Sequence, residues 1–547
     1  MLEAGKRVLL HDVERISALP RTPAEQVGRT PPPVAAARRL LLPSISDLLL
    51  LSTLAWLFLS GPDGWARLLV DGDTGWHIRT GEWILARGEV PRTDSFSFTR
   101  PGQPWFSWEW GADVLLGALH RAWGLKGVVL FSGLLVGLYA ALLFRFTLWR
   151  GANGFFALGA TLAAVAAASM HFLARPHLIT LLLLPLALWA LEADRRRPGR
   201  AVWLLAPLVA VWTNLHGGFL ALLALCALLA AGSYVESVLD LTGREGKRAA
   251  ALRYLALTAL CAAASLANPY GWRLHFHVFQ YLRSDWIRNV VLEFQSPRFR
   301  GEMMGQVEFL LLAGLVLTGL LLRRGQIVEA LWLLFWAHQA LGSVRHATIY
   351  VSLAAPLLAC ELTRLWTGWV AAAPRRSFRS ILDSLAGSLA AASRWTSPWP
   401  ALFAGWLLLA GQGIRWPADF PKELFPTALA AAHRQQLVAA RLVTSDEWAD
   451  YLLYRHYPDQ RVFFDGRSDF YGPGVGDDYL RLMNGHSGWE NILARYEVSA
   501  VLAPVNWPLA SILRLHRGWR IAAEDKQSVL FVRAGGARPP RGDSGRP

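Results

Sequence analysis

The chain has 547 residues, of which 53% are hydrophobic and 26 are tryptophan, and its mean hydropathy is +0.29. A soluble protein of this size does not carry so many long apolar runs, so the sequence predicts a polytopic α-helical membrane protein. The formal net charge of +15 comes from Lys and Arg residues that fall mostly in short loops. Such loops set topology and contact anionic lipid, which argues against a nucleic-acid partner.

The N-terminal segment, residues 1–43, is arginine-rich and contains the run Thr30-Pro31-Pro32-Pro33. It has no apolar core before Leu40 and no small-residue cleavage pattern, so we expect a disordered cytoplasmic tail and no signal peptide. The first span follows at about residues 44–60. Arg38 and Arg39 precede it, which places its N-terminal side in the cytoplasm.

Residues 61–110 form the first extracytoplasmic loop. Residues 75–85 have helical spacing, with tryptophan and isoleucine side chains on one side that suit the membrane surface. Residues 105–110 hold three tryptophans and Glu109. This density is typical of a segment in the headgroup region.

The remaining spans alternate between polar outside turns and basic inside turns. The outside turns lie at 174–177, 212–218, 268–273 and 343–346, and the inside turns at 194–197, 244–248, 323–324 and near 364. An amphipathic outside loop is expected at 274–303, a cytoplasmic linker at 366–398 and a last span near 400–413. The transmembrane domain therefore covers residues 44–414, with about eleven spans, the N-terminus inside and the C-terminus outside.

The C-terminal part, residues 415–535, has a different pattern that predicts a small extracytoplasmic α/β domain. Its expected strands lie at 441–445, 461–465, 499–503 and 527–532, and its expected helices at 446–457 and 488–496. Residues 536–547 are rich in Gly, Pro and Arg and predict a disordered tail. The three cysteines lie inside apolar segments of the transmembrane domain, so they predict neither a disulfide framework nor a thiolate metal site.

The outside ends of the spans share a composition that the inside ends lack, because they gather acids, histidines and asparagines beside arginines. They contain Asp71, Asp73, His77, Arg79, Glu82, Glu109, Arg175, His177, Asn214, His216, Asn268, Arg273, Arg345 and His346. Capping of helix ends near water explains any one of these residues. The joint pattern favours an outward-facing functional cavity, because ionisable groups at a bilayer boundary are costly unless they are solvated or used.

The stretch Asp71-Gly72-Asp73 opens the first outer loop directly after an apolar run. Two carboxylates one residue apart, with His77 close by, can hold a divalent cation such as Mg²⁺ or Mn²⁺, or one of them can act as a base. Arginines at the membrane surface suit a phosphate, because guanidinium binds oxyanions at two points. An acidic pair with several arginines is therefore consistent with chemistry on a lipid-linked phosphate.

This arrangement resembles the GT-C superfamily of integral-membrane glycosyltransferases, which includes protein O-mannosyltransferases and oligosaccharyltransferases. A group of large bacterial membrane proteins near that superfamily is similar in more detail. The similar segments are Asp71–Trp83, Arg175-Pro176-His177, Trp212–Gly218, Asn268–Trp272 and Phe464-Asp465-Gly466-Arg467-Ser468-Asp469-Phe470-Tyr471.

The resemblance implies an inverting sugar transfer from a polyprenyl-phosphate donor to a hydroxyl of a glycan, lipid or protein at the outer face of a bacterial inner membrane. Asp71 or, as we prefer, Asp73 would be the base, and Arg175, Arg273 and Arg345 would hold the leaving phosphate. A second Asp–x–Asp pair is missing from the outer loops, which puts a metal requirement in doubt. Asp465, Arg467 and Asp469 would grip the acceptor, although a tight turn closed by an Arg–Asp pair explains the same residues.

Two other functions fit the same polar cavity. A glycolipid transporter or flippase would use it without chemistry, but it predicts paired half-helices in two matching repeats, and we find no such repeat. A non-catalytic envelope scaffold would use its C-terminal domain to bind a partner.

Overall fold

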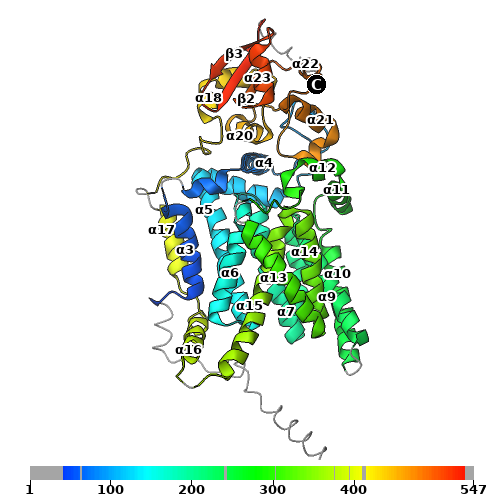
Figure 1. The fold of residues 1–547 in the computed structure, drawn as a ribbon. Coiled ribbons are helices and arrows are strands. Elements are labelled where there is room, and N and C mark those ends of the chain that lie inside the picture. Colours follow the sequence, from blue (N-terminus) through cyan, green and yellow to red (C-terminus); the bar gives the residue numbers. More distant parts are fainter. Residues whose placement is uncertain are drawn as a thin grey trace, which may run out of the picture.

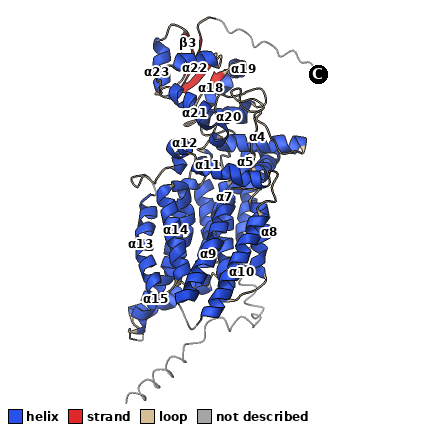
Figure 2. Cartoon of the chain, turned by 90° about the vertical axis from the view of Figure 1, so that its right-hand side faces the viewer, coloured by secondary structure: helices blue, strands red, loops and turns tan. Residues whose placement is uncertain are grey.

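The computed structural model describes residues 41–61, 64–239, 243–301, 304–374, 376–393, 395–409 and 414–535. Nearly all of the expected N-terminal tail and the whole tail 536–547 lie outside these residues. A bundle of roughly aligned helices forms one part of the molecule, and a smaller helix-and-sheet part covers one end of it (Figures 1 and 2).

Six helical segments in the described part are long and apolar enough to cross a membrane. They contain α5 (Trp110–Arg150), α6 (Gly154–Ala168), α7 (His177–Arg196), α9 (Phe219–Leu239), α13 (Met304–Arg323) and α15 (Ala347–Ala371). Shorter apolar helices are α3 (Ile45–Leu59), α8 (Leu205–Trp212), α14 (Ile327–Gly342) and α17 (Trp399–Leu409). With α10 (Arg244–Ala264), each expected span coincides with a helix, while the count of eleven spans stays a prediction.

The longest helix, α5, changes direction at Gly124, where φ is 62° and ψ is −156°. Glycine populates this backbone region without the steric cost that a Cβ brings. The part before the kink lies across the outer end of the bundle, and the part after it runs along the bundle (Figure 1). One helix therefore contributes both to the outer layer and to the span region.

The opposite end of the bundle is held by buried or half-buried ion pairs. Arg150 Nη1 lies 2.6 Å from Glu192 Oε1, and Arg195 Nη1 lies 2.8 Å from Glu329 Oε1. The helix α16 (Phe378–Ala391), in the expected cytoplasmic linker, also lies at this end (Figure 1).

The outer layer consists of short helices that lie across the bundle end. It contains η2 (Gly64–Leu69), α4 (Asp73–Arg87), η3 (Ser169–His171), α11 (Trp272–Arg283), α12 (Asp285–Val290), η5 (Leu292–Phe294) and η6 (Val344–His346). The short helix η4 (Ala201–Leu204) lies at the opposite end, where Arg253 packs on Trp203 and pairs with Asp194. Trp272, Phe276 and Phe279 of α11 are exposed, as expected for an amphipathic segment at the membrane surface. The sequence placed the apolar side of α4 there too, but Trp76 and Ile78 are buried.

The C-terminal part contains a four-stranded sheet in the order β1-β2-β4-β3. Its strands are β1 (Leu442–Val443), β2 (Ala500–Pro504), β3 (Trp519–Glu524) and β4 (Ser528–Arg533); β1 and β2 are parallel, and the other neighbours are antiparallel. Its helices are α18 (Thr427–Ala432), α19 (Arg434–Val438), α20 (Asp446–His456), α21 (Ser468–Met483), α22 (Trp489–Arg495) and α23 (Pro508–Leu515).

One expected strand takes a different role. Residues 461–465 form only isolated bridges, in which Val462 pairs with Leu442 of β1 and with Ser97 of the first outer loop. The expectation of a sheet strand at 461–465 is therefore wrong. The segment instead joins the first outer loop to the C-terminal sheet, a long-range pairing that the local pattern does not reveal.

Candidate active site at the outer end of the bundle

The helix α4 lies between α20 above and the first part of α5 below (Figure 1). Three glycines make this possible, because a Cβ at Gly72 or Gly75 would overlap the backbone of α20, and one at Gly81 would overlap the carbonyl of Asp113 in α5. Small residues let helix backbones approach closely in this way. The close packing brings the polar side chains of α4 against acids of both neighbouring helices.

A cavity of about 340 Å³ opens beside α4. Its outer wall is polar and includes Asp73, His77 and Glu109. Its inner wall lies between the spans and is apolar, with Leu181, Leu220, Ala221, Phe335 and Ile349. A cavity of this size with a few convergent polar groups fits a small or partly inserted ligand.

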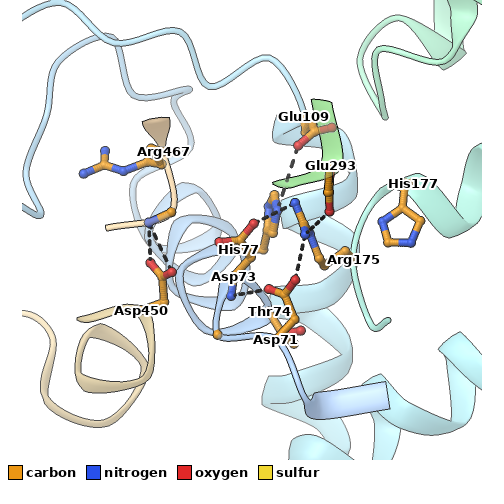
Figure 3. Close-up of polar contacts among 12 residues, drawn as sticks. Asp71, Asp73, Thr74, His77, Glu109, Arg175, His177, Glu293, Asp450 and Arg467 are labelled. Carbon is orange, nitrogen blue, oxygen red and sulfur yellow. Dashed lines mark hydrogen bonds and ion pairs between the residues drawn. The ribbon is translucent and has the colours of Figure 1, made fainter. Parts of the chain in front are cut away.

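Arg175 lies at the centre of the polar wall and contacts three carboxylates (Figure 3). Its Nη1 is 2.7 Å from Asp71 Oδ2 and 3.0 Å from Glu293 Oε1, and its Nη2 is 2.7 Å from Asp73 Oδ2. Burial acts against its charge, but these acids hold the pKa of Arg175 well above its usual value. Burial likewise disfavours the Glu293 carboxylate, yet Arg175 and Arg345 hold the pKa of Glu293 well below its usual range.

Asp73 is the first residue of α4. Its backbone N–H donates to Asp71 Oδ1 at 2.9 Å. Its own carboxyl group lies beside that of Asp450, and Gly466 packs against both groups. Burial raises the pKa of Asp73 to about 7, which Arg175 opposes. Asp73 is therefore poised to gain or lose a proton near neutral pH.

His77 and Glu109 form a second polar group on the same wall. His77 Nδ1 lies 2.6 Å from Asp113 Oδ1, while its Nε2 faces Glu109 Oε2 at 3.9 Å. His216 Nε2 approaches the other Glu109 oxygen at 3.6 Å. Burial raises the pKa of Glu109 to about 8 and lowers the pKa of both His77 and His216. At neutral pH these three side chains are therefore mostly uncharged.

The two acids and the histidine that were expected to bind a metal bind other side chains instead. Asp71 and Asp73 bind Arg175, and His77 binds Asp113. Among the described residues, no group of three or more His, Cys, Asp or Glu side chains is arranged to hold a metal ion. The expected set of Asp71, Asp73 and His77 does not fit a cation in this arrangement.

Most of the site residues expected from the sequence meet at the cavity. Its lining includes Asp73, His77, Glu109, Arg175, His177, His216, Arg345, His346, Arg467 and Asp469. Asp71 joins this group through Arg175.

The other expected residues have structural contacts instead. Arg79 binds the Tyr454 carbonyl and Glu82. The side chain of Asn214 accepts from the Trp110 indole, and that of Asn268 accepts from the Tyr270 amide in a turn. Arg273 is exposed at the start of α11.

Arg467 is almost fully buried and joins two distant segments. Its Nη2 lies 2.8 Å from Asp94 Oδ1 and 2.7 Å from Asp465 Oδ2, and its guanidinium carbon is 4.6 Å from the centre of a Trp105 ring. These contacts favour the turn interpretation for Asp465 and Arg467. Asp469 differs, because it lines the cavity and its Oδ2 lies 2.9 Å from His277 Nε2.

Several residues at the site were not singled out from the sequence. They are Asp113, His171, Glu293, Trp336 and Asp450. His171 lies at the end of the third apolar run. The expectation that polar residues at the outer span ends come together would have predicted it as a site residue. Asp113, Glu293 and Asp450 lie within amphipathic segments, and nothing in their local pattern separates them from ordinary surface acids.

Comparisons with known proteins find likeness among solved structures and no match by sequence. No family model matches the sequence, and no curated protein matches it. Among solved structures, the chain is similar to the apo form of the Archaeoglobus fulgidus oligosaccharyltransferase, with 13% sequence identity and a TM-score of 0.47. The match covers 91% of this chain and 75% of the archaeal chain.

Proposed function

We propose that the protein is a membrane glycosyltransferase that moves a sugar from a polyprenyl-phosphate donor to an acceptor hydroxyl at the outer membrane face. The observation that supports this most is the cavity itself, which combines an apolar wall between the spans with a wall of arginines and acids. A ligand that fits both walls has an apolar chain and an anionic head. A lipid-linked phosphate has both parts.

In the proposed reaction the acceptor oxygen bonds to the anomeric carbon of the sugar. The bond from that carbon to the phosphate oxygen breaks, and the polyprenyl phosphate leaves with the electron pair. The acceptor proton passes to Asp73, whose pKa of about 7 suits a general base near neutral pH. A single displacement inverts the anomeric centre.

Arginine side chains stabilise the charge that grows on the phosphate. Arg175 and Arg345 both line the cavity. Asp71 holds Arg175 and the first N–H of α4, which makes it a positioning residue in this scheme. No step uses a cation, because the two acids of the first loop are bound to Arg175. A bacterial inner membrane is the proposed location.

The experiment is transfer by the full chain reconstituted in lipid vesicles with a panel of radiolabelled polyprenyl-phosphate sugars and cell-envelope extract as acceptor. We expect polyprenyl phosphate release with one donor, and a loss of at least about a hundredfold in rate for Asp73→Asn, the scale on which general-base catalysis acts. Asp285→Asn, at an exposed acid that lies outside the cavity lining, is the matched control. Full activity of Asp73→Asn would refute the assigned base, and no turnover of any donor would refute the reaction.

A further inference from the structure

Three buried nitrogen atoms belong to residues that line the cavity and yet have no hydrogen-bond partner among the described residues. They are Trp76 Nε1, His171 Nδ1 and Trp336 Nε1. The residues are only 7%, 8% and 5% exposed. Buried polar groups are nearly always hydrogen-bonded, and an unpaired one is costly. Such atoms in a cavity wall point to a ligand that supplies the missing partners.

Two of these atoms belong to residues in the neighbourhood of Arg345, namely Trp336 and His171. Trp336 belongs to α14, and its ring centre is 6.0 Å from that of His346, the residue after Arg345. His171 ends η3, and its carbonyl accepts from His177 Nε2 at 2.6 Å. The remaining atom, on Trp76, belongs to α4, the helix that begins with Asp73.

Arg345 differs from Arg175 in the number of carboxylates that it contacts. Arg175 is already bound to Asp71, Asp73 and Glu293. In the described part of the chain, no carboxylate oxygen lies within ion-pair distance of Arg345. Its guanidinium carbon sits 4.4 Å from the centre of the Phe294 ring. Arg345 therefore packs on an aromatic ring without a direct carboxylate partner among the described residues, and its charge acts on Glu293 only from beyond ion-pair distance.

The wall next to this corner is apolar and continues between the spans. Phe335 precedes Trp336 in α14, and Leu220, Ala221 and Ala224 of α9 line the same cavity. The small side chains of Ala221 and Ala224 leave room beside the helix, and lipid chains need such an apolar path. An anion bound at Arg345 therefore has space for an attached hydrocarbon chain.

We propose that Arg345, the Trp336 indole N–H and His171 form the phosphate subsite for a lipid phosphate, separate from the acid-filled position at Arg175. This inference rests on the proposed function and deepens it by placing the leaving group. The reacting carbon of the donor then lies between this corner and the acids of α4. Arg175 serves to hold Asp71, Asp73 and Glu293.

The test measures binding of radiolabelled undecaprenyl phosphate to the full chain in lipid nanodiscs. We expect Arg345→Gln to weaken binding about tenfold to a hundredfold, as for a lost charge-assisted hydrogen bond. Trp336→Phe keeps the aromatic packing but removes the N–H, and we expect a loss of about tenfold. Arg288→Gln removes an exposed arginine of α12 in the same outer layer, away from the cavity lining, and should bind like the unmodified protein. Undecaprenol, which lacks the phosphate, should bind weakly and equally to all four proteins.

The outcomes separate this inference from the proposed function. If undecaprenyl phosphate binds but neither Arg345→Gln nor Trp336→Phe weakens it, the subsite is wrong while the donor class stands. If inorganic phosphate competes as well as the lipid phosphate, the site takes a free anion and the lipid part is wrong. If the lipid phosphate does not bind at all, both this subsite and the proposed donor are refuted. Transfer that fails only in Asp73→Asn, with binding intact, concerns the reaction and not the subsite.

Discussion

Arg175 and Arg467 each bind carboxylates from segments far apart in the chain. Arg175 joins the start of α4 to Glu293, and Arg467 joins Asp465 to Asp94. Removing charges from water is expensive, so such buried groups are stable only while every partner is present. At the scale of single residues, the outer site is therefore sensitive to the loss of either arginine.

Arg467→Gln leaves Asp94 and Asp465 buried without their cation. We expect the free energy of unfolding to fall by about 3–5 kcal/mol, the usual cost of breaking a buried pair. Thermal or denaturant unfolding in mild detergent measures this. Arg495→Gln is the control, because Arg495 is 61% exposed in its pair with Asp478 and should cost at most about 1 kcal/mol. Equal effects of the two substitutions would show that the Arg467 cluster does not hold the fold.

The buried carboxyl group of Glu109 makes the free energy of unfolding depend on pH. Burial raises its pKa from 4.5 in the unfolded chain to about 8 in the native protein. Between these values the native state holds a proton that the unfolded state has lost, so stability falls as pH rises through this window. The slope reaches at most about 1.4 kcal/mol per pH unit for one group.

Asp73 adds a slope of the same sign that ends near pH 7, and burial also raises the pKa values of Asp113, Asp450 and Glu447, which add slopes of the same sign. The share of Glu109 is therefore read as a difference: from pH 7 to 8 we expect the melting temperature to fall less steeply in Glu109→Gln than in the unmodified protein. Glu490→Gln, at an exposed carboxylate, should leave the slope unchanged. Equal slopes in Glu109→Gln and the unmodified protein would mean that other groups carry the pH dependence.

At the scale of single elements, α4 is the piece on which the site depends. Its glycines allow α20 and α5 to approach from opposite sides. That approach puts Asp73 beside Asp450 and His77 beside Asp113. A small increase in the distance between these helices therefore changes both pairs of polar side chains at once.

Gly81→Ala tests this packing. The added methyl group would overlap the Asp113 carbonyl, so we expect a loss of about 1–3 kcal/mol in unfolding free energy, as for other overpacked sites. The control is Gly159→Ala in α6, where a Cβ meets open space and helix propensity favours alanine by up to about 1 kcal/mol. If Gly81→Ala were as stable as Gly159→Ala, the close approach would not matter.

The sequence predicted the helices of the bundle well, because apolar runs and the sign of the charges at their ends are local properties. It also indicated that Asp73, Glu109, Arg175 and Arg345 share one face. It did not reveal that Asp113 binds His77 or that Asp450 meets Asp73, because these pairs depend on how α4 packs. It missed α21, a helix that contains Pro473 and is kinked at Gly472.

At the scale of the whole molecule, the C-terminal part lies at one end of the bundle and α16 lies at the other (Figure 1). The cavity beside α4 is at the end that carries the C-terminal part, and the basic side chains of Arg150 and Arg195 are at the other end. The positive-inside rule assigns the basic end to the cytoplasm. The site would then face the outside, where lipid-linked sugars would have to be presented to it.

Cysteine labelling in intact cells or spheroplasts tests this orientation. Arg517→Cys is exposed in the C-terminal part, and Arg200→Cys is exposed in an expected inside turn. We expect a membrane-impermeant maleimide to label the first and to label the second only after lysis. The unmodified protein controls for Cys226, Cys261 and Cys360, which are buried or half-buried. The reverse pattern would place the cavity in the cytoplasm.

The kink at Gly124 makes α5 a mechanical connection between the bilayer and the site. Its first part carries Asp113, and its second part packs against α3, α6, α7 and α15. Bilayer thickness sets the tilt of spanning helices. A change in host lipid therefore reorients the first part of α5, which supports His77. We expect transfer in vesicles of graded acyl-chain length to peak at one thickness, and a flat response would show that the first part of α5 moves independently of the span.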